Sequence, residues 1–122
     1  MRAALEGTPG LLLPEPTPGA EPSWFGFVLT VLPNAPFSRR SLVAFLEDRR
    51  ISTRRFFGGN LTRHPAYASV EYRVSGDLAS SDVVTENTFW VGVYPGLTPD
   101  MIAYIADSIN EFASLKRPVR VL

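Results

Sequence analysis

The chain contains no cysteine, and its only lysine is Lys116, so eleven of its twelve basic residues are arginine. Without thiols it forms no disulfide and supplies neither a thiolate nucleophile nor a cysteine ligand for zinc or an iron–sulfur cluster. A single lysine leaves few options for a mechanism that needs a lysine Schiff base. Twelve acidic residues balance the twelve basic ones, so no overall field attracts nucleic acid or an anionic membrane.

Long apolar runs are also missing. No run approaches the roughly 20 apolar residues of a transmembrane helix, and the N-terminus lacks the basic and apolar regions of a secretory signal. We therefore expect a cytoplasmic protein without a membrane partner. Its 122 residues correspond to one domain with one modest core.

Proline and glycine are concentrated near the N-terminus. Residues 7–22 carry five prolines and three glycines, a density that disfavours both a helix and a central strand. We therefore expect residues 1–21 to be a lead-in and the folded unit to start at residue 22. A tail is expected at residues 118–122, because Pro118 opposes continuation of a helix.

Hydrophobic patterning predicts three strands, at residues 24–32, 51–57 and 88–94. The first is almost continuously apolar, as expected for a strand that is covered on both faces. The third alternates, which places Phe89 on one face of the sheet and Trp90 on the other.

Two amphipathic helices are predicted, one capped by Ser38 and one capped by Thr98 that ends near Leu115. A short helical segment is expected between residues 76 and 87. The resulting order is strand, helix, strand, short helix, strand, helix. This order predicts an α+β fold, a two-layer α/β sandwich in which helices cover one face of a small three-stranded sheet, mixed or antiparallel.

The most distinctive stretch is residues 53–65, TRRFFGGNLTRHP. Gly58 and Gly59 permit a positive φ or a close approach of the backbone, and Asn60 offers two donors and an acceptor. The arginines offer planar forks that suit phosphate or carboxylate. The loop is therefore a candidate ligand wall, although Gly-Gly-Asn also occurs in simple turns.

Three other motifs carry weaker signals. Residues 25–28, FGFV, overlap the centre of the RNA-recognition signature, but the flanking basic and aromatic positions differ, so no nucleic acid is expected as a partner. Residues 60–62 have the form of a glycosylation acceptor without a secretory signal. His64 has no serine, cysteine or second metal ligand at a recognisable spacing. We therefore predict no catalytic residue and no metal site.

Several sequence blocks resemble one family of sugar enzymes. The most distinctive are PSWFGF at residues 22–27, FGGNLTR at 57–63 and NTFWVGVYPGL at 87–97. They are similar to the C-terminal domain of CDP-4-keto-6-deoxyglucose 3-dehydrases. These lipopolysaccharide biosynthesis proteins belong to the DegT/DnrJ/StrS group of sugar aminotransferase-like proteins, within the pyridoxal-phosphate (PLP) enzymes of fold type I.

The resemblance implies that residues 22–117 are the small domain of such an enzyme. In this family a large domain holds PLP, so this chain alone is expected to bind no cofactor. The small domain closes the active-site cleft, which implies that a set of its residues faces a nucleotide-linked sugar. In this chain the set is Phe25, Gly58, Gly59, Asn60 and Arg63. Each of three residues also has a simpler alternative role: Phe25 as a core residue, Asn60 as the cap of a turn and Arg63 as a solvated surface charge.

Two functions remain open. The chain is either an isolated or truncated C-terminal domain of a PLP-dependent nucleotide-sugar 3-dehydrase or aminotransferase-like enzyme of deoxysugar and lipopolysaccharide biosynthesis, or a non-catalytic interaction module. The first would be inactive without a large-domain chain, because binding and catalytic groups must meet in one cleft. The second would expose the former inter-domain face to a partner or to another copy. Relatives tend to carry arginine at the position of Val83, which removes one candidate contact with substrate.

Overall fold

The computed structural model describes residues 1–115, so Lys116 and the expected tail at 118–122 lie outside the described residues. In chain order the elements are helix α1 (Arg2–Leu5), strands β1 (Leu11–Leu12) and β2 (Gly26–Val31), helix α2 (Arg39–Asp48), strand β3 (Thr53–Arg55), the 3-10 turns η1 (Leu61–Arg63) and η2 (Pro65–Tyr67), helix α3 (Ala79–Asn87), strand β4 (Thr88–Gly92) and helix α4 (Pro99–Leu115). From β2 onward this is the predicted order, and the α+β class is confirmed.

The sheet has four strands in the order β1-β2-β4-β3, and every neighbouring pair is antiparallel. Three strands were predicted, and the structure adds β1. Of the two predicted kinds of sheet, mixed or antiparallel, the sheet is antiparallel. The central pair is β2 with β4, in a register that sets Phe27 opposite Val91 and Leu29 opposite Phe89.

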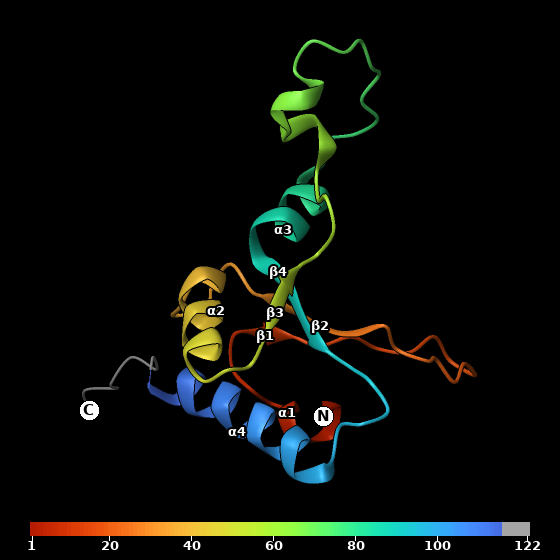
Figure 1. Ribbon diagram of the computed structural model, residues 1–122. Coiled ribbons are helices and arrows are strands. Elements are labelled where there is room, and N and C mark those ends of the chain that lie inside the picture. Colours follow the sequence, from red (N-terminus) through yellow and green to blue (C-terminus); the bar gives the residue numbers. More distant parts are fainter. Residues whose placement is uncertain (116–122) are drawn as a thin grey trace.

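One apolar core lies between the sheet and its helices (Figure 1). Because side chains alternate along a strand, β2 buries Phe27 and Leu29 on the same face on which β4 buries Phe89. Helices α2 and α4 cover that face with a further apolar set: Leu42, Leu46, Ile105, Ala106, Ile109, Phe112 and Ala113. The predicted arrangement of two layers, with helices on one face, is therefore present.

Both predicted helix caps are formed. The Ser41 backbone N–H donates to Ser38 Oγ at 3.1 Å, and the Ser38 N–H donates back to Ser41 Oγ at 3.2 Å. At α4 the Met101 N–H donates to Thr98 Oγ1 at 3.2 Å. These bonds satisfy backbone donors that have no partner within the helix, and they fix where each helix begins.

The N-terminal segment, residues 1–21, contains the short helix α1 and the short strand β1. Leu5, on α1, is fully buried, and Asn110 Nδ2 on α4 donates to the Ala4 carbonyl at 3.0 Å. The proline-rich and glycine-rich residues 7–22 were expected to form neither a helix nor a central strand, and they form neither, because α1 precedes them and β1 is an edge strand that pairs on one side only. The division of the chain at residue 22 remains a prediction.

The predicted strands are shorter in the structure. Strand β2 begins at Gly26, so Trp24 and Phe25 lie outside it, and its second face is only half-buried. Strand β3 ends at Arg55, because the Phe57 N–H bonds back to the Arg55 carbonyl at 2.9 Å and closes a turn. Strand β4 ends at Gly92, two residues before the expected end.

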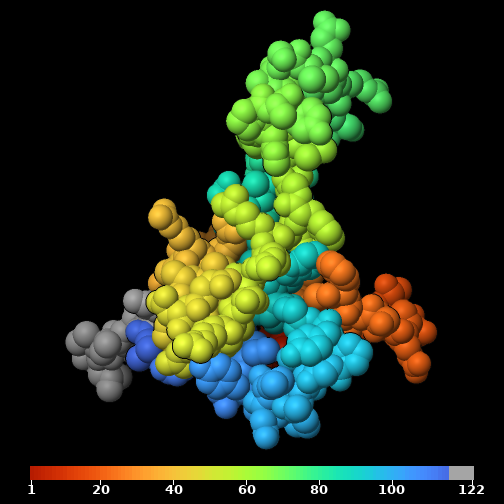
Figure 2. Space-filling view, viewed as in Figure 1, coloured from red at the N-terminus to blue at the C-terminus, as the bar shows by residue number. Residues whose placement is uncertain are grey.

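An arm, residues 65–77, projects from the body between β3 and α3, and it is green in Figures 1 and 2. All its residues are exposed, including Tyr67, Val70, Tyr72 and Val74. The arm therefore contributes no side chain to the core. None of the helices in residues 1–115 combines the length and the apolar composition that crossing a membrane requires.

Replacing Leu5 by alanine tests whether the N-terminal segment is part of the core. Leu5→Ala is expected to lower the free energy of unfolding by about 2–5 kcal/mol, because it removes a fully buried side chain. The control is Leu12→Ala, whose side chain is 58% exposed and which should cost no more than about 0.5 kcal/mol. Urea denaturation measures both, and equal small losses would contradict the packing of α1.

Candidate functional site

The glycine loop, residues 57–60, follows β3 and turns the chain toward α3. Phe57 and Gly59 have positive φ angles of 48° and 59°. A Cβ atom on Gly59 would overlap the Thr85 side chain on α3, whereas one on Gly58 would meet only the end of the Leu61 side chain, at 3.1 Å. The close approach expected of the diglycine is therefore made by Gly59.

Asn60 attaches the loop to α3. Its side chain is only 3% exposed. Its backbone N–H donates to Thr85 Oγ1 at 2.6 Å, and its Nδ2 donates to Asp82 Oδ1 at 2.7 Å. Its Oδ1 accepts from the N–H of Thr62 at 3.1 Å and from its hydroxyl at 2.7 Å. Asn60 thus caps η1, and a direct role in substrate binding remains a prediction.

Arg63 is paired with the same carboxylate. Its Nε donates to Asp82 Oδ1 at 3.2 Å and its Nη2 donates to Oδ2 at 2.8 Å. The hydrogen bond from Arg63, followed by that from Asn60, lowers the pKa of Asp82, and the bond to Asp82 raises the pKa of Arg63. One carboxylate on α3 therefore holds both predicted polar site residues.

His64 Nε2 donates to the Gly58 carbonyl at 2.6 Å. Because a carbonyl only accepts, Nε2 carries the proton in this arrangement. The bond fixes the ring against the glycine loop, so the contact supports a structural role. No group of three or more His, Asp or Glu side chains placed to hold a metal ion occurs within residues 1–115.

An aromatic cluster, formed by Phe25, Phe56, Phe57 and Trp90, lies on the sheet face opposite the helices. The Trp90 ring is 5.0 Å from that of Phe25 and 4.8 Å from that of Phe57, both edge to face. Phe25 is 76% exposed and Phe57 is 69% exposed. The alternative of Phe25 as a core residue is therefore wrong.

Two shallow hollows adjoin the aromatic cluster. One, of about 440 Å³, is bounded by Phe57, Gly58 and Gly59 on one side and by Ser81 and Val84 of α3 on the other. The second, of about 260 Å³, lies between Phe25, Trp90 and Arg54. Phe25, Gly58 and Gly59 thus border one aromatic surface, while Asn60 and Arg63 face α3.

Phe57 and Trp90 were not among the site residues predicted from the sequence. A signal was present for Trp90, because alternation with Phe89 places it on the face away from the helices. Phe57 gave no comparable signal, since its exposure follows from the turn that ends β3.

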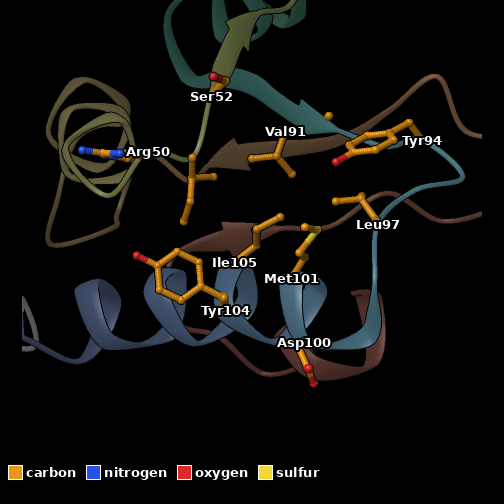
Figure 3. Close-up of a pocket in the computed structure, with 11 residues that line it drawn as sticks. Arg50, Ser52, Val91, Tyr94, Leu97, Asp100, Met101, Tyr104 and Ile105 are labelled. Carbon is orange, nitrogen blue, oxygen red and sulfur yellow. The ribbon is translucent and has the colours of Figure 1, made fainter.

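A larger hollow, of about 540 Å³, lies between the sheet and the start of α4 (Figure 3). Its walls are mainly apolar, from Val91, Leu97, Met101 and Ile105, while the Asp100 side chain points away from it. It contains none of the predicted site residues. Without a pair of acid and base groups facing each other, it offers no catalytic arrangement.

The two glycines provide a matched test of the loop. Gly59→Ala is expected to destabilise the chain by about 1–3 kcal/mol, because alanine at positive φ is strained and its Cβ overlaps Thr85. Gly58→Ala meets only a flexible side-chain end and should be tolerated. Thermal unfolding compares the two variants, and equal destabilisation would contradict the described approach to α3.

Asp82→Asn tests the pairing of the loop with α3. Because the pKa of Asp82 is lowered in the folded state, its contribution is complete above the unfolded pKa of about 4 and is lost as pH falls through the folded pKa. The stability difference between the native chain and the variant should therefore shrink on acidification from pH 6 to pH 3. The control is Glu71→Gln, on the exposed arm, and urea unfolding across this range measures both variants.

The sequence matches the model of the DegT/DnrJ/EryC1/StrS aminotransferase family over residues 1–110. It is 56% identical over 114 residues to dTDP-4-dehydro-2,6-dideoxy-D-glucose 3-dehydratase of Saccharopolyspora spinosa, covering 93% of this chain and 25% of that protein. It is 45% identical over 105 residues to lipopolysaccharide biosynthesis protein RfbH of Salmonella typhimurium, covering 86% and 24%. The chain thus spans about a quarter of the length of these relatives.

The fold is similar to that of E. coli GDP-4-keto-6-deoxy-D-mannose-3-dehydratase, solved with bound hydrated PLP. The TM-score is 0.79 at 24% identity, over 88% of this chain and 28% of the other. The resemblance inferred from the sequence blocks is confirmed, and the chain belongs to the DegT/DnrJ/EryC1/StrS aminotransferase family.

Proposed function

We propose that this chain is the small domain of a PLP-dependent nucleotide-sugar 3-dehydratase or aminotransferase-like enzyme of deoxysugar and lipopolysaccharide biosynthesis, inactive alone and located in the cytoplasm. The observation that carries the proposal is its 56% identity to a quarter of a sugar 3-dehydratase. The remaining three quarters of such an enzyme would supply the catalytic groups.

The glycine loop and the aromatic cluster are the proposed contribution to substrate binding. Phe25 would form an apolar wall, and the backbone of Gly58 and Gly59 would approach the nucleotide-linked sugar. Asn60 and Arg63, which are both bonded to Asp82, would keep the loop in position. The exposure of Phe25 and Phe57 supports this proposal, because aromatic side chains of this size usually find a partner.

The described residues do not fit PLP by themselves. The only lysine of the chain, Lys116, lies outside them, and the Nε2 of the only histidine already donates to the Gly58 carbonyl. The hollows beside the aromatic cluster lack a facing acid and base. We therefore assign cofactor binding to a large-domain chain and derive no chemical step from this one.

An interaction module, including self-association through the aromatic cluster, is the alternative. Exposed Phe25 and Phe57 are compatible with it, but the comparisons do not favour it. If the chain is the small domain of an enzyme, a large-domain chain restores catalysis. If it is an interaction module, a partner only covers the exposed aromatic cluster.

A complementation experiment distinguishes the small domain of an enzyme from an interaction module. After incubation with PLP and removal of the free cofactor by desalting, the purified chain should retain no cofactor absorbance band, whereas it should retain a band and show sugar turnover after co-expression with the unmatched three quarters of Salmonella RfbH. Phe57→Ser should weaken complementation, whereas Met101→Ser, a control exposed on the helix side, should not. Association without any gain of cofactor binding would contradict the proposed function and support the interaction module.

A further inference from the structure

Five residues of the arm, 70–74, alternate between apolar and charged side chains. The sequence is VEYRV, so Glu71 and Arg73 lie between Val70, Tyr72 and Val74. Alternation of β-branched or aromatic residues with charged ones is typical of a strand with one buried face. All five side chains are nevertheless exposed in this structure. We call residues 70–74 the arm segment.

The arm segment has no partner strand. The sheet consists of β1, β2, β4 and β3, and the arm segment does not belong to it. None of the hydrogen bonds described within residues 1–115 involves the backbone of residues 71–74, and no ion pair in that part of the chain involves Glu71 or Arg73. The arm segment therefore offers free backbone donors and acceptors together with two opposite charges.

The sheet of a second copy offers the arm segment no suitable edge. On the outer side of β3 the Thr53 N–H donates to Glu47 at 2.6 Å, and the Thr53 carbonyl accepts from Arg54 Nη1 at 2.8 Å. At the other edge β1 has only two residues. By contrast, the arm stands clear of the body (Figures 1 and 2). The arm of a second copy is therefore the accessible partner.

The charges of the arm segment select one pairing with itself. In an antiparallel pair centred on Tyr72, Glu71 lies opposite Arg73 of the second copy, and Arg73 lies opposite Glu71 of that copy. A shift by two residues would oppose two glutamates or two arginines, which is unfavourable. A shift by one residue would set charged residues opposite apolar ones. Parallel pairing in register would place like charges side by side.

We propose that the arm segment pairs with the arm segment of a second copy as an antiparallel, two-fold ribbon centred on Tyr72. The contact is isologous, because each copy contributes the same residues. Five residues from each copy bury much less than the roughly 1,600 Å² of a standard interface, so association is weak and is expected only in the concentrated chain. The inference goes beyond the proposed function, because it needs neither the aromatic cluster nor a large-domain chain.

Charge reversal tests the ribbon, with self-association measured by sedimentation equilibrium over a concentration series. Glu71→Arg and Arg73→Glu should each weaken self-association by about tenfold or more, because both charge pairs become like-charge pairs. An equimolar mixture of these two variants should associate again, because every opposed pair then joins a guanidinium to a carboxylate. The control is Asp48→Arg, at an exposed position of α2, which changes the net charge as Glu71→Arg does and should associate as the native chain does.

A cysteine scan tests the register, and the lack of native cysteine makes it specific. Tyr72→Cys should form an intermolecular disulfide under mild oxidation, because Cα atoms of directly opposed residues lie about 4.5–5.5 Å apart, within disulfide range. The control is Val70→Cys, whose two thiols would be about 14 Å apart in the proposed register and should cross-link far less. Non-reducing electrophoresis measures both, and circular dichroism checks that the variants keep their fold.

Three results would overturn the proposal. They are a native chain that stays monomeric up to about 1 mM, the upper end of weak binding, a mixture of Glu71→Arg and Arg73→Glu that fails to associate, and equal cross-linking at positions 70 and 72. Because PLP and RfbH are absent from these assays, their failure is independent of the complementation experiment.

Discussion

The pairing of β2 with β4 is the contact on which the other features depend. Its register joins Leu29 to Phe89 and Phe27 to Val91 on the helix side, and it sets Val28 opposite Trp90 on the other side. A slip by one residue would exchange the faces, burying Trp90 and exposing Phe89. Gly26 contributes because a Cβ there would lie 3.0 Å from the Trp90 ring. The same register therefore creates both the core and the aromatic cluster.

The glycine loop has its shape because α3 holds it from one side. Thr85 accepts the Asn60 N–H and donates its own proton to the Ser81 carbonyl at 2.7 Å, so one hydroxyl links the loop to the helix backbone. Asp82 binds both Asn60 and Arg63. Since α3 runs directly into β4, the position of the loop is tied to the central strand pair. Loop and aromatic cluster thus form one connected surface.

Much of this architecture was predictable, because its signals are local. Ser38 and Thr98 marked the helix starts through hydrogen bonds that span three residues, and alternation along 88–94 gave the faces of Phe89 and Trp90. The contacts of α1 and β1 were not predictable, since they join residues far apart in the chain, such as Ala4 and Asn110. Of the predicted site residues, the close approach of Gly59 was foreseen, whereas the bond from Asn60 to Asp82 had no local signal.

The two borders of the sheet have a consequence for solubility. Strand β1 offers only two residues, Leu11–Leu12, and β3 has its outward backbone groups engaged by Glu47, by Arg54 and by the turn at Phe57. An edge strand that is short, or whose backbone groups are already hydrogen-bonded, discourages strand pairing between molecules. The chain can therefore expose aromatic side chains and still resist the formation of fibrils through unpaired edge strands.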